Sequence, residues 1–243
     1  SVHAMRAIIK AHPEWKSRKE EIEQLRGEML QALKQHAEES PEEGNLKMPT
    51  LREFAGVHNS LHTMKHHGIP YPNGFTEEVL NSVNEIAGWE GKMQNSKPEI
   101  VRLAVGRFIN DVVTQLDEKI AATEKPLPAN PTSDLKLAYY SGHDNTLIPL
   151  LNGLQIYDGY HPPMGSHVIF ELYKQNQHKP IKQPDDWYVR VLYNFKEKKL
   201  PECQRQEVQV GGVGSVCPYS VFRKIADNLI PKDYEKECGI KTE

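Results

Sequence analysis

A histidine and an aspartate stand side by side at the point where a predicted strand ends and a predicted helix begins. Residues 137–141 have the composition of a strand, Gly142 follows, and His143 and Asp144 come directly after it. The next segment has leucines at helical spacing, namely Leu147, Leu150, Leu151 and Leu154. Such a junction places an imidazole and a carboxylate at the carboxyl edge of a sheet, where open α/β sheets bind ligands. Both groups can transfer protons.

A His-Asp pair is common, and a polar turn after a strand is the alternative interpretation, so the sequence that follows has to decide. The downstream segments are 159–166, which contains Pro162-Pro163, the predicted strands 168–173 and 187–194, and the Cys-Pro-containing segment 217–222. In this order they resemble the histidine acid phosphatases, branch 2 of the histidine phosphatase superfamily, in the group of prostatic, lysosomal and lysophosphatidic acid phosphatases.

The resemblance differs in quality along the chain. It is specific from about Leu135 to Cys238, whereas from Ser1 to Thr123 it concerns only the order of helices.

The resemblance implies roles for the pair. In this family a histidine attacks phosphorus, cationic groups hold the phosphoryl oxygens, and an acid protonates the departing alkoxide. Protonated His143 would donate a hydrogen bond to a phosphoryl oxygen, and Asp144 would be the proton donor. Asn145 and Thr146 would begin the helix rather than take part in catalysis. A carboxylic acid donates only while protonated, so low pH or a raised pKa fits an acid optimum.

The same resemblance implies a small phosphomonoester as substrate and a phosphohistidine intermediate. It implies neither a cofactor nor a metal ion, and it leaves a homodimer open.

One part of the family pattern is missing from this sequence. The family's nucleophilic histidine lies in an Arg-His-Gly-x-Arg-x-Pro segment after the first strand, and no Arg-His pair occurs here. The sequence also opens in a predicted helix, Val2 to Ile9, with no start methionine or signal peptide. We therefore expect the chain to be the C-terminal part of a longer phosphatase. The alternative is a phosphatase-fold remnant that binds a phosphorylated ligand or a protein partner without turnover.

The order of predicted elements gives the fold class. Helices are predicted over residues 14–36, from Pro49-Thr50 to His67-Gly68, from Thr76 onward, and from Pro98 to about Ala122. Strands follow only after a proline-rich linker. We expect an incomplete α/β fold of the histidine phosphatase type, with a helical cap at residues 1–125 and the C-terminal part of a doubly wound sheet at residues 126–243.

Three cysteines leave the pairing open on spacing alone. Cys203 and Cys217 bracket a polar loop that a disulfide closes in the family, so the resemblance implies a Cys203–Cys217 bridge. Cys238 would then be free or bonded to a residue outside this chain. A disulfide favours the secretory pathway, with a lysosomal or extracellular destination, and three reduced thiols in a cytosolic protein are the alternative.

The composition argues against two classes of partner. A formal net charge of −3 argues against a nucleic-acid binder. No apolar run approaches the ~20 residues that span a bilayer. The hydrophobic content of 38% is low for an α/β protein, which fits either apolar surface left for a partner segment or a polar cap.

Four histidines suggest a second possible site. His58, His62 and His66 recur every four residues, so they share one helix face, and His67 follows. Two histidines four apart can share a zinc ion, but a usable site needs a third ligand, and no carboxylate motif is obvious nearby. We therefore interpret the four as a polar face of the cap at the rim of a substrate cleft.

Overall fold

The structure is a computed structural model, and it describes residues 10–39, 54–72, 74–124, 135–175, 186–204, 208–210 and 213–239. The chain divides into two compact units. The first contains Ser1–Asn95 and Asp158–Gly165, and the second contains Ser96–Tyr157 and Ser166–Glu243. The predicted boundary between cap and core, at residue 125, lies outside the described residues, so that division remains a prediction.

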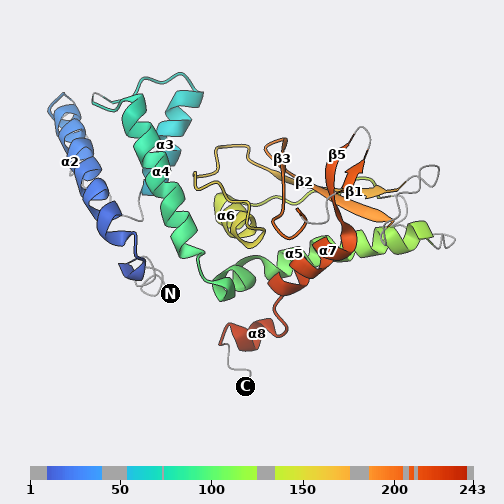
Figure 1. Cartoon of the computed structure of the whole chain (residues 1–243). Coiled ribbons are helices and arrows are strands. Elements are labelled where there is room, and N and C mark those ends of the chain that lie inside the picture. Colours follow the sequence, from blue (N-terminus) through green and yellow to red (C-terminus); the bar gives the residue numbers. More distant parts are fainter. Residues whose placement is uncertain are drawn as a thin grey trace. The chain divides into compact units, whose positions relative to one another are not determined.

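The described part of the first unit contains three helices, in which α4 (Glu77–Gln94) packs against both α2 (Trp15–Glu39) and α3 (Phe54–His66) (Figure 1). The apolar residues Ile22, Leu25 and Met29 of α2 are buried in a core that also holds Phe54, Leu61, Leu80, Val83 and Ile86. The helix starts follow from local sequence. Thr76 caps α4, because its side-chain oxygen accepts a hydrogen bond from the Val79 amide.

The segment 158–165 belongs to this first unit because two contacts hold it on α4. The backbone amide of His161 donates to the side-chain oxygen of Asn84 at 3.2 Å. At Gly88, an added Cβ would lie 1.9 Å from the carbonyl oxygen of Gly159. Gly159 itself has a φ of +86°, which favours glycine. The two backbones can therefore approach this closely only without a side chain at residue 88.

The second unit is an antiparallel sheet with helices packed on it. Its strands are β1 (Val168–Lys174), β2 (Trp187–Tyr193), β3 (Lys196–Lys198), β4 (Val208–Val210) and β5 (Gly214–Pro218). The order is β1-β2-β5-β4, and β3 pairs with β2. Every pairing among these described strands is antiparallel, and the sheet is not closed. The α/β class predicted from the sequence is confirmed.

The described residues of the second unit also form the helices α5 (Pro98–Glu124), α6 (Asp144–Gly153), α7 (Tyr219–Leu229) and α8 (Tyr234–Glu237). Helix α7 packs on β2 and β5, and α5 packs on both α7 and α6 (Figure 1). The core between them is formed by apolar side chains from all these elements, including Val105, Ile109, Leu150, Leu154, Val189, Val191, Phe222 and Leu229.

The predicted strand at residues 137–141 is wrong. Residues 135–143 lie outside any helix or strand, and 79% of Leu137 and 84% of Tyr139 are exposed. A strand needs a hydrogen-bonded neighbour, and none of the described strands pairs with this segment. Residues 137–141 therefore have the composition of a strand but no neighbour among the described strands to pair with.

The polar loop between the two cysteines contains strands that the sequence did not predict. β4 and β5 pair within it, and β5 extends the main sheet through Val189↔Cys217. Strands of only three and five residues have too short a pattern to be found from composition, because their conformation is set by neighbours.

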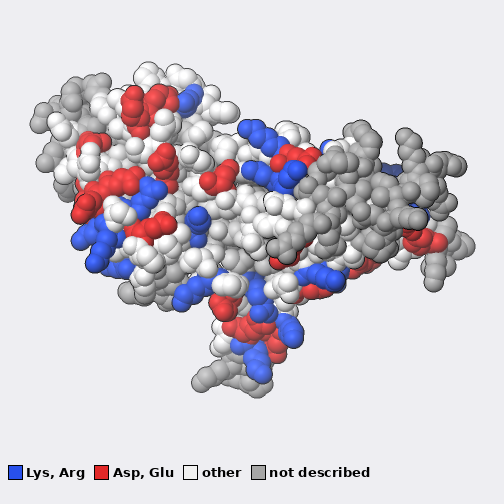
Figure 2. Space-filling view, in the orientation of Figure 1, with Lys and Arg blue, Asp and Glu red and all other residues white. Residues whose placement is uncertain are grey.

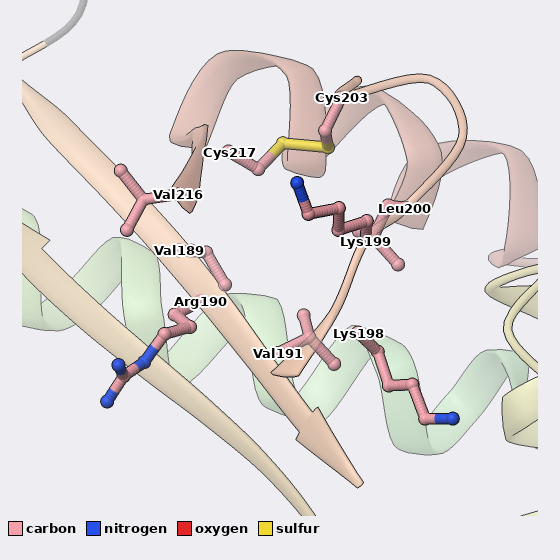
Figure 3. A pocket seen from close by; sticks show the side chains of 9 residues that line it. All are labelled: Val189, Arg190, Val191, Lys198, Lys199, Leu200, Cys203, Val216 and Cys217. Atoms are coloured by element: carbon pink, nitrogen blue, oxygen red, sulfur yellow. A yellow bond between two sulfur atoms is a disulfide. The ribbon is translucent and has the colours of Figure 1, made fainter. Parts of the chain in front are cut away.

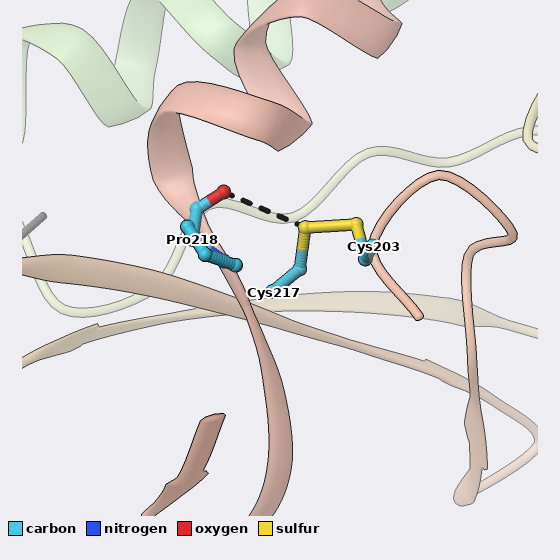
Figure 4. The surroundings of a disulfide bond; sticks show 3 residues. All are labelled: Cys203, Cys217 and Pro218. Carbon is cyan, nitrogen blue, oxygen red and sulfur yellow. Dashed lines mark hydrogen bonds between the residues drawn. A yellow bond between two sulfur atoms is a disulfide. The ribbon is translucent and has the colours of Figure 1, made fainter. Parts of the chain in front are cut away.

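The Cys203–Cys217 disulfide is confirmed, with the two Cα atoms 5.2 Å apart (Figure 4). The sulfur of Cys217 lies 3.5 Å from the Pro218 carbonyl oxygen. Because a disulfide sulfur has no hydrogen to donate, we regard this as a close contact. Both cysteines are buried beside the sheet, so the bridge ties β5 to the turn after Leu200. Cys238 is exposed and outside this disulfide.

The close approach at Gly88 gives a prediction about stability. Gly88→Ala would force a methyl group against the Gly159 carbonyl and should lower the free energy of unfolding by about 1–3 kcal/mol. Gly27→Ala is the matched control, because nothing lies within 4 Å of a Cβ at this exposed helical position. The control should raise stability by up to about 1 kcal/mol. Urea unfolding followed by tryptophan fluorescence measures both, and equal effects would contradict the packing described.

Candidate active site

His143 and Asp144 lie where the extended segment 135–143 enters α6. His143 is the N-cap residue, and its carbonyl oxygen accepts hydrogen bonds from the amides of Thr146 at 2.9 Å and Leu147 at 3.0 Å. Asp144 is the first residue of the helix. The imidazole is exposed and the carboxylate is half-buried. The helix start therefore fixes the backbone of both residues and leaves the imidazole accessible.

The position of the pair is set by the buried residues further along α6. Ile148, Leu150 and Leu151 are buried there. At the end of the helix, a Cβ at Gly153 would lie 2.8 Å from a methyl carbon of Val101 and 3.2 Å from the side chain of Leu229. Helix α6 is therefore held tightly against α5 and α7, and its first turn is held in place with it.

The local electrostatics at this helix start favour an anion. Backbone amides at the first turn of a helix point outward and give it a partial positive charge, which suits a phosphate group. The Asp144 carboxylate already accepts a hydrogen bond from the Asn145 amide at 2.6 Å. The sequence predicts that Asn145 and Thr146 begin the helix. In the structure, Asp144 begins the helix and its side chain accepts this hydrogen bond from a backbone amide.

Arginines for binding a phosphoryl group are already engaged elsewhere in the described part of the second unit. Arg102 pairs with Glu237 at 2.9 Å, and Arg190 pairs with Glu171 at 2.6 Å. Arg223 pairs with Asp117 and Asp227, and Arg107 lies over the ring of Tyr234. The positive charge needed to bind a phosphate dianion would therefore have to come from residues other than these four arginines.

Two cavities of the second unit lie away from the pair. One is lined by β2, β5 and the disulfide and measures about 10 Å³, which is about the volume one water molecule needs (Figure 3). The other, about 520 Å³, lies among α5, α7 and the start of β2. Two pairs of its lining residues are bonded to each other: the Tyr219 hydroxyl donates to Asp117 at 2.6 Å, and the Trp187 ring N–H donates to Glu124 at 3.1 Å. Burial, followed by that bond to Asp117, raises the pKa of Tyr219.

The histidines of the first unit form a packed cluster that includes one residue the sequence analysis missed. The ring centroid of His58 lies 4.8 Å from the ring centroid of His62 and 4.6 Å from that of His161. His58 is only 1% exposed and His161 only 3%. The predicted polar face is therefore partly wrong, since His58 belongs to the interior, although His66 and His67 are exposed. His161 lies 99 residues beyond His62 in the sequence, and no local pattern connects them.

The packing of this histidine cluster affects the pKa of His62. Burial, followed by the nearby cations Lys65 and His66, lowers the pKa of His62, and Glu77 opposes this shift. Among the described residues, no three His, Cys, Asp or Glu side chains are grouped so that they could hold a metal ion.

Charges of both signs are interspersed on the described surface visible in Figure 2. Of the helices in the described ranges, none is long and apolar enough to cross a bilayer.

A comparison with known protein families identifies the family to which this chain belongs. The family model "Histidine phosphatase superfamily (branch 2)" matches residues 10–194, which include both His143 and Asp144. The chain belongs to this superfamily.

Several relatives of this chain are acid phosphatases by name. Two probable acid phosphatases of Dictyostelium discoideum are 31% identical over 97% of this chain and 32% identical over 89% of it. The lysosomal acid phosphatase of Xenopus laevis is 28% identical over 78% of the chain. The matched regions make up 51%, 46% and 40% of these relatives, so this histidine phosphatase chain spans about half of their length.

The packing of the histidine cluster leads to a prediction about metals. Adding zinc or EDTA should leave the melting temperature of the chain unchanged, because the rings of His58, His62 and His161 pack against one another. A zinc ion that binds only the folded chain, at a free concentration 100 times its dissociation constant, would raise the free energy of unfolding by about 2.7 kcal/mol. A zinc-dependent rise in melting temperature that His161→Gln removes, and that the exposed control His67→Gln retains, would contradict this prediction.

Proposed function

We propose that this chain supplies the proton donor and the second phosphate-binding histidine of an acid phosphatase that hydrolyses phosphomonoesters. The nucleophilic histidine would come from an Arg-His-Gly-x-Arg-x-Pro segment that the chain does not contain. The observation that supports this most is the placement of His143 and Asp144 on the anchored first turn of α6, within the region matched by the family model.

The first chemical step divides between the missing segment and this chain. The nucleophilic imidazole attacks phosphorus, a nitrogen–phosphorus bond forms, and the bond from phosphorus to the ester oxygen breaks. Asp144, protonated, gives its proton to that oxygen, so that an alcohol leaves rather than an alkoxide. In the second step the Asp144 carboxylate takes a proton from water, the water oxygen bonds to phosphorus, and the nitrogen–phosphorus bond breaks. Phosphate is released and both groups return to their starting states.

His143 would act on the phosphoryl oxygens rather than on the leaving group. A protonated imidazole donates a charge-assisted hydrogen bond to an oxygen on which charge develops. The amides at the start of α6 would add to the same stabilisation. The exposed imidazole and the half-buried carboxylate are neighbours on one turn, which fits one group on the phosphate and the other on the ester oxygen.

Location and assembly belong to the same proposal. The Cys203–Cys217 disulfide is compatible with an oxidising compartment, and relatives named lysosomal acid phosphatase occur at 24–28% identity. We propose a secretory route, ending in a lysosome or outside the cell. The proposed function is also compatible with a homodimer.

A second function fits the chain on its own: a non-catalytic protein of the same fold that binds a phosphorylated ligand or a protein partner. The absence of an Arg-His pair favours this alternative. The presence of Asp144 argues against it, because binding without turnover does not require a proton donor.

The two roles can be separated by substitution in a polypeptide that contains both the nucleophile segment and these residues. Asp144→Ala should lower kcat by about 10²–10⁴-fold and largely spare inhibition by phosphate, because it removes only proton transfer. His143→Ala should lose both turnover and phosphate binding.

Steady-state hydrolysis of p-nitrophenyl phosphate and of an alkyl phosphate measures these effects. Asp111→Ala, an exposed aspartate on α5, is the matched control and should keep normal rates. The 243-residue chain alone serves as the background sample. Normal rates in both site variants would show that the assigned roles are wrong.

A further inference from the structure

The end of α3 presents apolar and titratable side chains together on the first unit. His66, His67 and Ile69 are exposed there, with 51% of Ile69 accessible to solvent. Met164 is 50% exposed, and its sulfur lies 3.8 Å from the hydroxyl oxygen of Thr63. His66 and His67 follow Thr63 by three and four residues, so they are its neighbours on the helix surface. We call His66, His67, Ile69 and Met164 the α3 end surface.

The helix end fixes the backbone of this surface. Gly68 has a φ of +65°, and its amide donates to the Lys65 carbonyl oxygen at 3.2 Å. The Ile69 amide donates to the Met64 carbonyl oxygen at 2.9 Å. These two bonds after a left-handed glycine form a Schellman motif, which closes the helix. Ile69 is therefore presented to solvent in a defined position.

The charge around this helix end depends on its two exposed histidines. Lys65 and Glu77 form an ion pair at 2.7 Å, so their charges offset each other. The Tyr71 hydroxyl donates to the same carboxylate, and Glu78 adds a negative charge in the first turn of α4. Histidine gains a positive charge as the pH falls from about 8 to about 5. Protonation of both histidines therefore changes the sum over these described groups from negative to positive.

Other described groups near α3 change this balance little in that range. Burial, followed by Lys65 and His66, lowers the pKa of His62, so His62 gains its charge only in stronger acid. Carboxylates keep their charge between about pH 5 and pH 8. Further titratable groups on α3, α4 and the segment 158–165 are buried His58, Glu90 and His161, and also Glu85 and Asp158.

We infer that the α3 end surface binds an anionic lipid bilayer in acidic surroundings and releases it near neutral pH. Ile69 and Met164 would enter the interface, where apolar side chains are buried among headgroups. Protonated His66 and His67 would be attracted to the negative surface potential of the lipids. The inference does not depend on the proposed function, because binding to lipid requires no turnover.

A bilayer fits this surface better than a second protein does. A stable protein interface buries about 800 Å² on each partner, with apolar side chains in shaped contact. The α3 end surface offers only two half-exposed apolar side chains beside groups that become cationic. A bilayer interface accepts such side chains without a matching shape, and it supplies the opposite charge.

The test is sedimentation of the chain with lipid vesicles. Vesicles of phosphatidylcholine that contain phosphatidylserine should bind the chain about 30-fold more tightly at about pH 5 than at about pH 8, the effect of two added cations at an anionic surface. Vesicles of phosphatidylcholine alone should bind weakly at both values. Equal binding at the two pH values, or equal binding to the two kinds of vesicle, would overturn the inference.

Substitution of the histidines tests the source of the pH dependence. His66→Lys combined with His67→Lys keeps the positive charge at both pH values, so this variant should bind the anionic vesicles tightly at about pH 8 as well. Asn110→Lys combined with Thr114→Lys is the matched control, because it adds the same charge at exposed positions of α5. The control should bind as weakly as the wild type at about pH 8. Similar binding by the two double variants would overturn the inference.

Substitution of Ile69 tests the apolar contact. Ile69→Ser should weaken binding at about pH 5 by about 10-fold, because it removes apolar area that the interface would bury. Its circular dichroism should match the wild type, since the side chain is half-exposed. Phe195→Ser, at a 76% exposed aromatic residue of the second unit, is the control and should bind normally. Unchanged binding by Ile69→Ser would overturn the inference. A dimer at about pH 5 that Ile69→Ser abolishes would also overturn it, because a second copy would then be the partner.

Discussion

The packing of α6 against α5 and α7 is the constraint on which the candidate site depends. The contact of Gly153 with Val101 and Leu229 leaves no room for a side chain, and Leu150 and Leu154 bury the same face of the helix. Because the far end of the helix is fixed in the core, its first turn has one position relative to α5. Apolar contacts more than a helical turn away therefore place His143 and Asp144.

That constraint positions the pair but does not complete a phosphatase site. The described arginines of the second unit are bonded to acidic residues or to Tyr234, and these contacts link α5 to α7 and α8, and β1 to β2. Under the proposed function, the nucleophile comes from a segment that this chain does not contain, and any cation besides His143 comes from outside these four arginines.

Much of this arrangement could be predicted from sequence, and the failures have physical causes. The helix starts at Thr76 and Pro98, the strands at 168–173 and 187–194 (observed as 168–174 and 187–193) and the Cys203–Cys217 bridge were predicted, because local capping and periodicity or the family resemblance specify them. The strand at 137–141 was wrong, since strand formation depends on a neighbour that composition does not reveal. The strands β4 and β5 and the packing of His161 on His58 were missed, because partners distant in sequence determine them.

The central claim is that His143 binds the phosphoryl group while another histidine attacks it. The most direct measurement is mass spectrometry of the phosphorylated enzyme, trapped with a slow phosphomonoester substrate under alkaline quench, in a polypeptide that contains both the nucleophile segment and these residues. The account predicts that the phosphate lies on the histidine of the Arg-His-Gly segment and that peptides containing His143 are unmodified. Phosphate on His143 would contradict the account.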